Sequence, residues 1–369
     1  MFLPLLLSVA VLLAGVPAHA ADTNAAPAAP AKKSAATSAT KAPSKPKPKA
    51  KTAAAAGGSY AGREDVRAFA DEVAQEAGLP KRDVERWFAD AKYQPKIVAA
   101  MDRPLLEPPK WFEYSRGFLA PERVAAGVAF WRANEDALAR AQAQYGVPPE
   151  IIVAIIGVET YYGRNVGSYR VIDALATLAF DYPRRAPFFR GELKEFVMLA
   201  RDQGFSPLVP KGSFAGAMGM PQFMPGSYRR FAIDFDNDGH ADLWRSNADV
   251  IGSVAHYLAR HDWQRGQPIL LPALVAPESR ETALRRLDGG VSERRLPAAW
   301  EVDGVRAANA PADATPDPVG LLLLEESAVP GDATLWVAYP NWYVITRYNK
   351  SRLYASAVFF LAEKVRLAH

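Results

Sequence analysis

The chain between residues 60 and 145 has the hydrophobic periodicity of α-helices. In the ranges 64–77, 81–91 and 121–145, apolar residues recur at spacings of three and four, and Pro or Gly lies at the breaks. This spacing places the apolar side chains on one face of each helix. We therefore expect a helical lead-in over residues 60–145.

A different pattern begins near residue 268 and continues to about residue 344. Short β-prone runs, separated by Gly, Pro, Asp and Asn, have the sequences PILLPALV, GLLLLEES, TLWVAYP and WYVITRY. They predict a small antiparallel sheet, and residues 350–367 then predict one amphipathic helix. Residues 268–369 are thus expected to form a small β subdomain that closes with a helix.

The first 59 residues are expected to lie outside the folded part. Residues 1–20 are apolar, are short for a bilayer span and end in Ala18-His19-Ala20, as secretory signal peptides do, although Lys and Arg are absent before the apolar run. Residues 21–59 are almost all Ala, Pro, Lys, Ser and Thr, a composition typical of a disordered tether. We expect export to the periplasm.

Charge and cysteine content exclude several classes of function. The tether holds seven lysines against the single acid Asp22, an excess larger than the net charge of +4 of the whole chain, so the remainder is slightly acidic and nucleic-acid binding is not expected. The sequence has no cysteine, which excludes thiol chemistry and a lipid-modified cysteine. No later stretch is long and apolar enough for a membrane span, so neither a span nor a lipid anchor is expected.

An acidic residue near the end of an apolar helix is the leading catalytic candidate. Pro148-Pro149-Glu150 is a typical helix start, and Gly163 is a plausible stop after IIVAIIGVETYY. Ile151, Ile155 and Glu159 are spaced by four, which places the carboxyl group on the isoleucine face and partly removes it from water. Desolvation raises the pKa of a carboxyl group, as a general acid requires.

The residues GVETYYG, YRVIDALATLAFDYPRRAPFFRGEL, KGSFAGAMGMPQFMPGSYRRFAIDFDNDGHADLW and NWYVITRYN, in this order, resemble the lytic murein transglycosylase B family. The resemblance implies an α+β fold with a mainly helical, lysozyme-like catalytic core over residues 146–267. The helical lead-in and the small antiparallel β insertion flank this core. It also implies that Glu159 is the single catalytic acid and base and that no cofactor takes part in the reaction.

The implied reaction cleaves the β-1,4 bond between N-acetylmuramic acid (MurNAc) and N-acetylglucosamine (GlcNAc) in peptidoglycan glycan strands, and leaves 1,6-anhydromuramic acid ends. Two alternatives remain at this point: a lysozyme-like muramidase that uses the same Glu159 with water, and a glycan-binding wall protein without activity. The sequence identifies no protein partner. HExxH and GxSxG motifs are absent, so zinc-protease and serine-hydrolase functions lack support.

Further binding residues are predicted around the glycine-rich stretch 212–223, where backbone can approach a ligand closely. The resemblance places this stretch along the glycan cleft, with Gln222 beside the acid to orient an N-acetyl group and Ser213 as a weaker candidate. Sugar sites use aromatic faces and hydroxyl groups. The aromatic candidates are Tyr161, Phe223, Trp342, Tyr343 and Tyr348. The resemblance implies that the C-terminal motif returns to the cleft, which favours Tyr343 and Tyr348 among them.

Residues 234–242 resemble an EF-hand calcium loop, in which side-chain oxygens alternate along the chain and Gly239 allows the sharp turn. The twelfth position is Arg245 rather than the usual bidentate Glu, which leaves sodium as an alternative ion. The predicted ion would be structural. The predicted metal-site residues are Asp234, Asp236, Asp238, His240, Asp242 and Asp249.

Overall fold

A computed structural model describes residues 58–103 and 108–369. The predicted signal peptide, residues 1–20, lies outside the described residues, and so does the predicted tether except for its last two residues. Ser59 pairs with Lys92 in an isolated β-bridge, and the next residue, Tyr60, is buried. The described fold therefore begins with residues that the sequence assigned to the tether.

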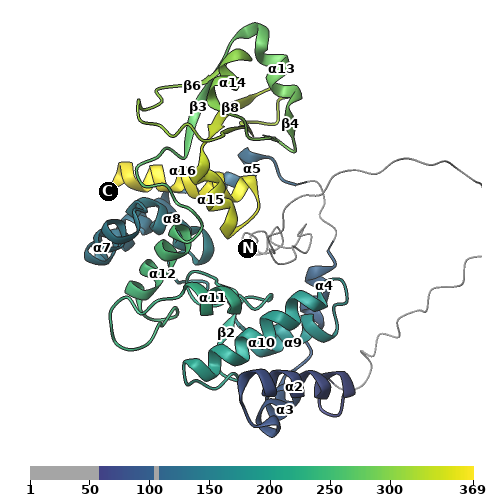
Figure 1. The fold of residues 1–369 in the computed structure, drawn as a ribbon. Coiled ribbons are helices and arrows are strands. Elements are labelled where there is room, and N and C mark those ends of the chain that lie inside the picture. The colour runs from purple at the N-terminus through teal and green to yellow at the C-terminus, as the bar shows by residue number, and fades with distance from the viewer. Residues whose placement is uncertain (1–57, 104–107) are drawn as a thin grey trace, which may run out of the picture.

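A group of helices lies at the bottom of Figure 1. The predicted helices 64–77 and 81–91 are confirmed as the first two of them, and α2 ends at Gly78, which adopts a left-handed conformation. Packing between α2 and α10 joins the lead-in to the rest of the chain. The helices of this group are α2 (Glu64–Ala77), α3 (Lys81–Asp90), α4 (Pro95–Met101), α9 (Val171–Phe180) and α10 (Ala186–Asp202).

The middle of the molecule is a helical layer in which α16 packs against both α6 and α8 (Figure 1). The predicted single helix 121–145 is wrong, because the chain breaks at Asn134, where φ is −135°. The Asn134 side chain donates to the carbonyl of Phe130 at 2.7 Å and so competes with helical hydrogen bonding. This layer contains α6 (Pro121–Ala133), α7 (Glu135–Tyr145), α8 (Pro149–Thr160), α12 (Asn247–Ala259) and α16 (Arg352–Ala368).

A six-stranded antiparallel sheet with the order β4-β5-β7-β8-β3-β6 lies at the top of Figure 1. Three of the four predicted runs are confirmed as its longest strands, with Leu322 opposite Trp336 in the central pair. Buried Trp300, Val305 and Leu321 belong to a small separate core beside it. The strands are β3 (Leu270–Val275), β4 (Leu287–Asp288), β5 (Val291–Ser292), β6 (Val305–Ala307), β7 (Gly320–Glu325) and β8 (Ala333–Ala338).

The fourth predicted run, WYVITRY, is a helix, and the strand prediction is wrong there. Pro340 starts helix α15 (Pro340–Tyr348), a position where its missing N–H costs nothing. Its buried residues recur at helical spacing, at Asn341, Val344, Ile345 and Tyr348. Burial with a period near 3.6 therefore outweighs the β-propensity of the individual residues.

The remaining elements are short. Strand β1 (Tyr169–Arg170) pairs antiparallel with β2 (Lys211–Gly212), which fixes the start of the glycine-rich loop to the segment before α9. None of the helices in the described ranges has the length and hydropathy needed to cross a membrane. The other short helices are α5 (Trp111–Arg116), α11 (Pro225–Phe231), η1 (Pro277–Ser279), α13 (Arg280–Arg285) and α14 (Pro297–Val302).

Candidate active site

Helix α8 carries the candidate acid through the middle of the core. Every residue from Ile151 to Val158 is buried, so the helix is enclosed on all sides rather than on the isoleucine face alone. Glu159 differs because it is only partly buried. The apolar helix therefore brings one carboxyl group from the interior to an accessible position.

The surroundings of Glu159 favour its protonated form. Burial raises the pKa of Glu159 to about 7, and a hydrogen bond from the Tyr354 hydroxyl to Oε1, at 2.7 Å, opposes this increase. Near neutral pH a substantial fraction of Glu159 is thus protonated. A carboxyl group in this state can donate a proton and then accept one, as acid–base catalysis requires.

Three tyrosines from three helices surround the acid. The Tyr354 and Tyr348 rings are nearly parallel, with centroids 6.4 Å apart, and the Tyr257 ring lies 4.9 Å from Tyr348. Burial raises the pKa of each of these tyrosines far above its usual value, so their hydroxyl groups stay neutral. These hydroxyls donate to Glu159, to Pro221 O at 2.6 Å and to Arg347 O at 2.7 Å.

The glycine-rich loop contacts the end of α8. Thr160 Oγ1 donates to Met220 O at 2.9 Å, and the Tyr348 hydroxyl holds the next carbonyl, that of Pro221. Gln222 is partly exposed and has a left-handed backbone with φ 53°. Its amide nitrogen donates to the carbonyl oxygens of Val166 and Gly219, at 3.2 and 2.9 Å. Gln222 is thus fixed within the loop that contacts the end of α8.

Three of the predicted binding residues support this loop from inside. Ser213 is buried, and its Oγ accepts the N–H groups of Ala215 and Ala217. Phe223 is 2% exposed and packs on Tyr348, which is itself buried. All three are buried in this structure and support the loop, so their contact with a sugar stays a prediction.

The structure places Tyr161 and Tyr343 in different regions. Tyr161 directly follows α8 and is partly exposed, close in sequence to the acid. Tyr343 packs against the sheet instead, because Arg294 lies 4.9 Å from its ring centroid and its hydroxyl fills the space beside Gly320. The expectation that Tyr343 returns to the acid receives no support from these contacts.

Sequence reasoning missed Tyr354 and Tyr257, whose neighbours come from distant parts of the chain. Tyr354 is separated from Glu159 by 195 positions. One signal was available: Tyr354 lies on the apolar face of the C-terminal helix, and a buried tyrosine hydroxyl usually has a hydrogen-bond partner. The sequence does not identify that partner.

A second carboxyl group does not face Glu159 within the described residues. The pKa of Glu159 reflects only burial and the Tyr354 hydrogen bond, with no contribution from a neighbouring charge. Another acid, the partly buried Glu192, accepts the N–H of Gly226 at 2.8 Å and so caps the start of α11. Glycosidases that use water typically place two carboxyl groups across the bond. The described site offers one.

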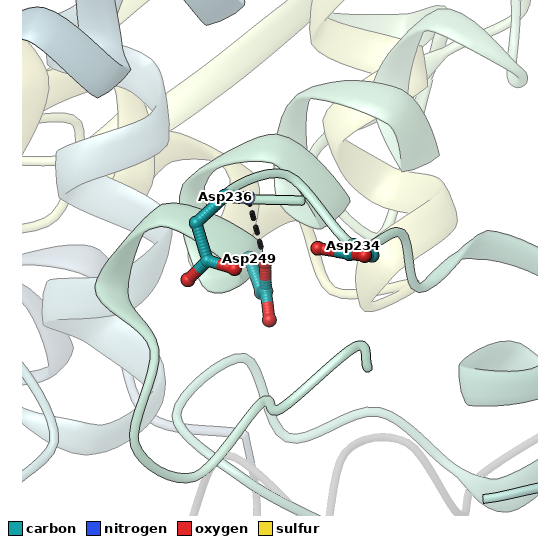
Figure 2. Close-up of side chains that lie close together, drawn as sticks. All are labelled: Asp234, Asp236 and Asp249. Atoms are coloured by element: carbon teal, nitrogen blue, oxygen red, sulfur yellow. Dashed lines mark hydrogen bonds between the residues drawn. The ribbon is translucent and has the colours of Figure 1, made fainter. Parts of the chain in front are cut away.

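Asp234, Asp236 and Asp249 form a second acidic site, shown in Figure 2. One carboxylate oxygen from each lies within 4.8 Å of the others, and Asp249 is fully buried. Oxygen ligands clustered in this way suit a hard cation such as calcium. These three residues therefore fit the predicted ion.

The other three predicted ligands are not part of this cluster. The Asp238 carboxylate accepts the N–H of His240, and the Asp242 carboxylate accepts those of Trp244 and Arg245. His240 itself is exposed. The cluster thus contains three of the six predicted ligands, and ligand roles for Asp238, His240 and Asp242 stay predictions.

Comparison with known proteins identifies the family. The family described as "Transglycosylase SLT domain" matches residues 61–363. The chain is 40% identical over 328 residues to the membrane-bound lytic murein transglycosylase B of Escherichia coli K12, covering 85% of each protein. It is also 43% identical to the solved soluble lytic transglycosylase SltB1 of Pseudomonas aeruginosa, with a TM-score of 0.76 and coverage of 82% and 99%.

Two further solved structures carry ligands. Escherichia coli Slt35 in complex with calcium is 40% identical, with a TM-score of 0.75 and coverage of 85% of this chain and 96% of that one. Pseudomonas aeruginosa SltB3 in complex with NAG-anhNAM-pentapeptide is 30% identical, with a TM-score of 0.69 and coverage of 82% and 80%. Since both the family match and the identity extend over most of the sequence, the chain belongs to the lytic murein transglycosylase B family of SLT-domain proteins.

Proposed function

We propose that this chain is a peptidoglycan lytic transglycosylase that uses Glu159 as its only catalytic carboxyl group. The observation that carries the proposal is the isolated, partly buried Glu159 with a pKa near 7 and a single donor, Tyr354. Family membership supports the substrate, and a relative was solved with an anhydro-muropeptide bound.

The proposed reaction needs no water. Protonated Glu159 gives its proton to the oxygen that links MurNAc C1 to GlcNAc, and this C1–O bond breaks. The resulting carboxylate removes the proton from the MurNAc C6 hydroxyl while that oxygen bonds to C1. The product ends in a 1,6-anhydro ring, and Glu159 is protonated again.

Gln222 is proposed to position the substrate. Both N–H groups of its side-chain amide are directed to loop carbonyls, so its amide oxygen is the atom left to accept a hydrogen bond. An acetamido N–H on the sugar is a suitable donor. Tyr161, at the accessible end of α8, remains the aromatic candidate for sugar contact.

Asp234, Asp236 and Asp249 are proposed to hold a structural calcium ion. The cluster geometry supports this, together with the relative solved in complex with calcium. The ion would join the loop after α11 to the first turn of α12, because Asp249 lies in that turn. We assign it no part in bond cleavage.

We also propose that the protein acts in the periplasm. The signal-like residues 1–20 and the peptidoglycan substrate support this location. One relative carries the name membrane-bound, so cell fractionation is the direct test. Recovery of the protein only with membranes would contradict a periplasmic enzyme free of the membrane.

The defining experiment is digestion of purified peptidoglycan by the wild type and by Glu159→Gln, with the soluble products identified by mass spectrometry. The wild type should release muropeptides with anhydro ends, one water lighter than hydrolysis products. Loss of a general acid typically costs about 10²- to 10⁴-fold in rate, so the variant should be nearly inactive. Reducing ends would indicate a muramidase. A cleaving variant would refute the assignment of Glu159, and no cleavage by either protein would favour a glycan-binding role.

A further inference from the structure

Arg123 of α6 is a buried cation beside the end of α8. Only 8% of its surface is exposed, and Nη1 donates to the carbonyl of Gly157 at 2.5 Å. The guanidinium lies between two rings, 5.2 Å from the centroid of Phe118 and 4.5 Å from that of Tyr161. Within residues 58–103 and 108–369, no carboxylate pairs with it, and its Nε has no hydrogen-bond partner.

A buried charge without a counterion needs compensation from its surroundings. Here it comes from the C-terminal end of a helix, where unsatisfied carbonyl groups carry partial negative charge, and from two aromatic faces. Burial lowers the pKa of Arg123, and, of its neighbours, Tyr162 and Tyr161 oppose this decrease. Two of these compensating groups, the Gly157 carbonyl and the Tyr161 ring, lie at the end of α8, which carries Glu159.

The chain directly after Glu159 has an unusual backbone. Tyr161 and Tyr162 are both left-handed, with φ of 52° and 58°, a conformation that residues with a side chain seldom adopt. Arg123 contacts both tyrosines. Its guanidinium stacks on the Tyr161 ring, and its carbonyl oxygen accepts a hydrogen bond from the Tyr162 hydroxyl at 3.1 Å. Side chain and backbone of one residue thus fix the turn that ends α8.

The Tyr162 ring completes this arrangement. A side chain at Gly157 of α8 would meet the Tyr162 hydroxyl at 2.6 Å, and one at Gly127 of α6 would meet it at 2.4 Å. The ring therefore fills the crossing between α6 and α8, and α6 also packs on α16, which carries Tyr354. Arg123 lies where the helices of Glu159 and of its hydrogen-bond donor meet.

From this geometry we infer that Arg123 is a positioning residue, which locks the end of α8 so that Glu159 stays against Tyr354 during cleavage. The inference rests on the proposed role of Glu159 as the acid. It assigns Arg123 no contact with the substrate. Loss of the lock should therefore lower kcat and leave KM almost unchanged.

Arg190 provides a matched control in the same chain. Its Nε donates to Ala179 O in the last turn of α9, at 3.2 Å, and its guanidinium lies 6.0 and 5.5 Å from the centroids of Phe69 and Phe180. Arg190 thus repeats the arrangement of Arg123, an arginine at a helix end and over two rings. Of these two arginines, only Arg123 contacts the end of a helix that carries a catalytic candidate.

The test compares Arg123→Lys with Arg190→Lys in steady-state release of anhydro-muropeptides. Lysine keeps the charge but cannot stack and donate as a planar guanidinium does. We expect kcat to fall about tenfold or more for Arg123→Lys with KM within twofold, whereas Arg190→Lys should keep both within twofold. Equal losses in the two variants, or a higher KM with unchanged kcat for Arg123→Lys, would overturn the inference.

Two further experiments distinguish a positioning role of Arg123 from misfolding of the variant and from failure of the proposed function. Millimolar guanidinium should restore part of the activity of Arg123→Ala, and it should not restore Glu159→Gln. If Arg123→Ala does not fold, Tyr162→Phe removes only the hydrogen bond to the Arg123 carbonyl and should lower kcat about threefold. Absence of rescue in folded Arg123→Ala, or full activity of Tyr162→Phe, would contradict the lock. A Glu159→Gln variant that still cleaves would refute the proposed function itself.

Discussion

Glu159 and Asp249 are both carboxyl groups at the end or start of a core helix, and burial raises the pKa of both, yet their hydrogen bonds differ. Glu159 accepts one hydrogen bond, from the Tyr354 hydroxyl. Asp249 is fully buried and accepts three backbone N–H groups, those of Phe235, Asp236 and Asp242. One site leaves the negative charge short of donors, and the other surrounds it with them.

This difference in hydrogen bonding suits Glu159 to proton transfer and Asp249 to a structural role. Hydrogen bonds to an ionised carboxyl group stabilise the charged form, whereas burial destabilises it. With one donor, Glu159 stays near the protonation midpoint at neutral pH. Asp249 uses its oxygens to fix the path of the loop that contains Phe235 and Asp242. The following predictions test whether this contrast holds.

The largest effect is expected from Asp249→Ala. The substitution leaves three backbone N–H groups without their acceptor, and each unsatisfied buried donor costs about 1–3 kcal/mol, so the free energy of unfolding should fall by about 4 kcal/mol. Urea unfolding with a chelator present measures the loss. The matched control is Asp238→Ala, because Asp238 is exposed and should change the value by less than about 0.5 kcal/mol. Equal losses would show that Asp249 has no special structural role.

Glu159→Gln should make the protein more stable at high pH. The folded pKa, about 7, lies above the ordinary value of 4.5, so the folded state binds the proton more tightly than the unfolded state does. Wild-type stability is therefore fully present below pH 4.5 and falls as the pH rises to 7, by about 3 kcal/mol in total. Glutamine does not ionise, so the Glu159→Gln variant should not lose this stability as the pH rises. Unfolding curves at pH 4 and pH 8 should show a gain for the variant only at pH 8; an equal gain at both would contradict the assigned pKa.

The two sites also differ in how far the sequence predicts them. The aspartate loop is a local pattern, so residues 234–242 identify it, and only the choice among its oxygens needs the structure. That choice depends on which carboxylate oxygens the fold brings within reach of one another, as it does for Asp234, Asp236 and Asp249. Glu159 was identified from its helix and from the resemblance. Its donor, Tyr354, was not, because hydrophobic periodicity places a residue on a face without showing what lies opposite.

The fold shows the same limit. Periodicity predicts α2, α3 and the longest strands, because each depends on neighbours in sequence. It fails at residues 342–348, where β-prone residues form α15, since tertiary burial decides between two locally acceptable structures. It fails again at Asn134, where one side-chain hydrogen bond to Phe130 divides a long helical pattern.

Tyr354→Phe should lower kcat about tenfold and move the pH profile. The Tyr354 hydroxyl lowers the pKa of Glu159, so its removal should raise that pKa further above 7. Because the first step needs the protonated acid, the decline of kcat/KM on the alkaline side should shift to higher pH. Tyr228→Phe is the matched control, since that buried hydroxyl donates to Ala241 O in the aspartate-loop region. A profile that moves equally in both variants, or not at all in Tyr354→Phe, would contradict the role of Tyr354.

Calcium should have the smallest effect, and only on stability. An ion that binds the folded state alone adds RT ln(1 + [Ca²⁺]/Kd), which is about 0.8 kcal/mol at three times the Kd. The melting temperature of chelator-treated protein should therefore rise by a few degrees at most, and kcat below the melting range should not change. Asp236→Asn should abolish the rise, because Asp236 contributes one of the three clustered carboxylates. A change in kcat with calcium at constant stability would connect the two sites, whereas calcium that acts only on the melting temperature keeps the structural role of the loop separate from the chemistry at Glu159.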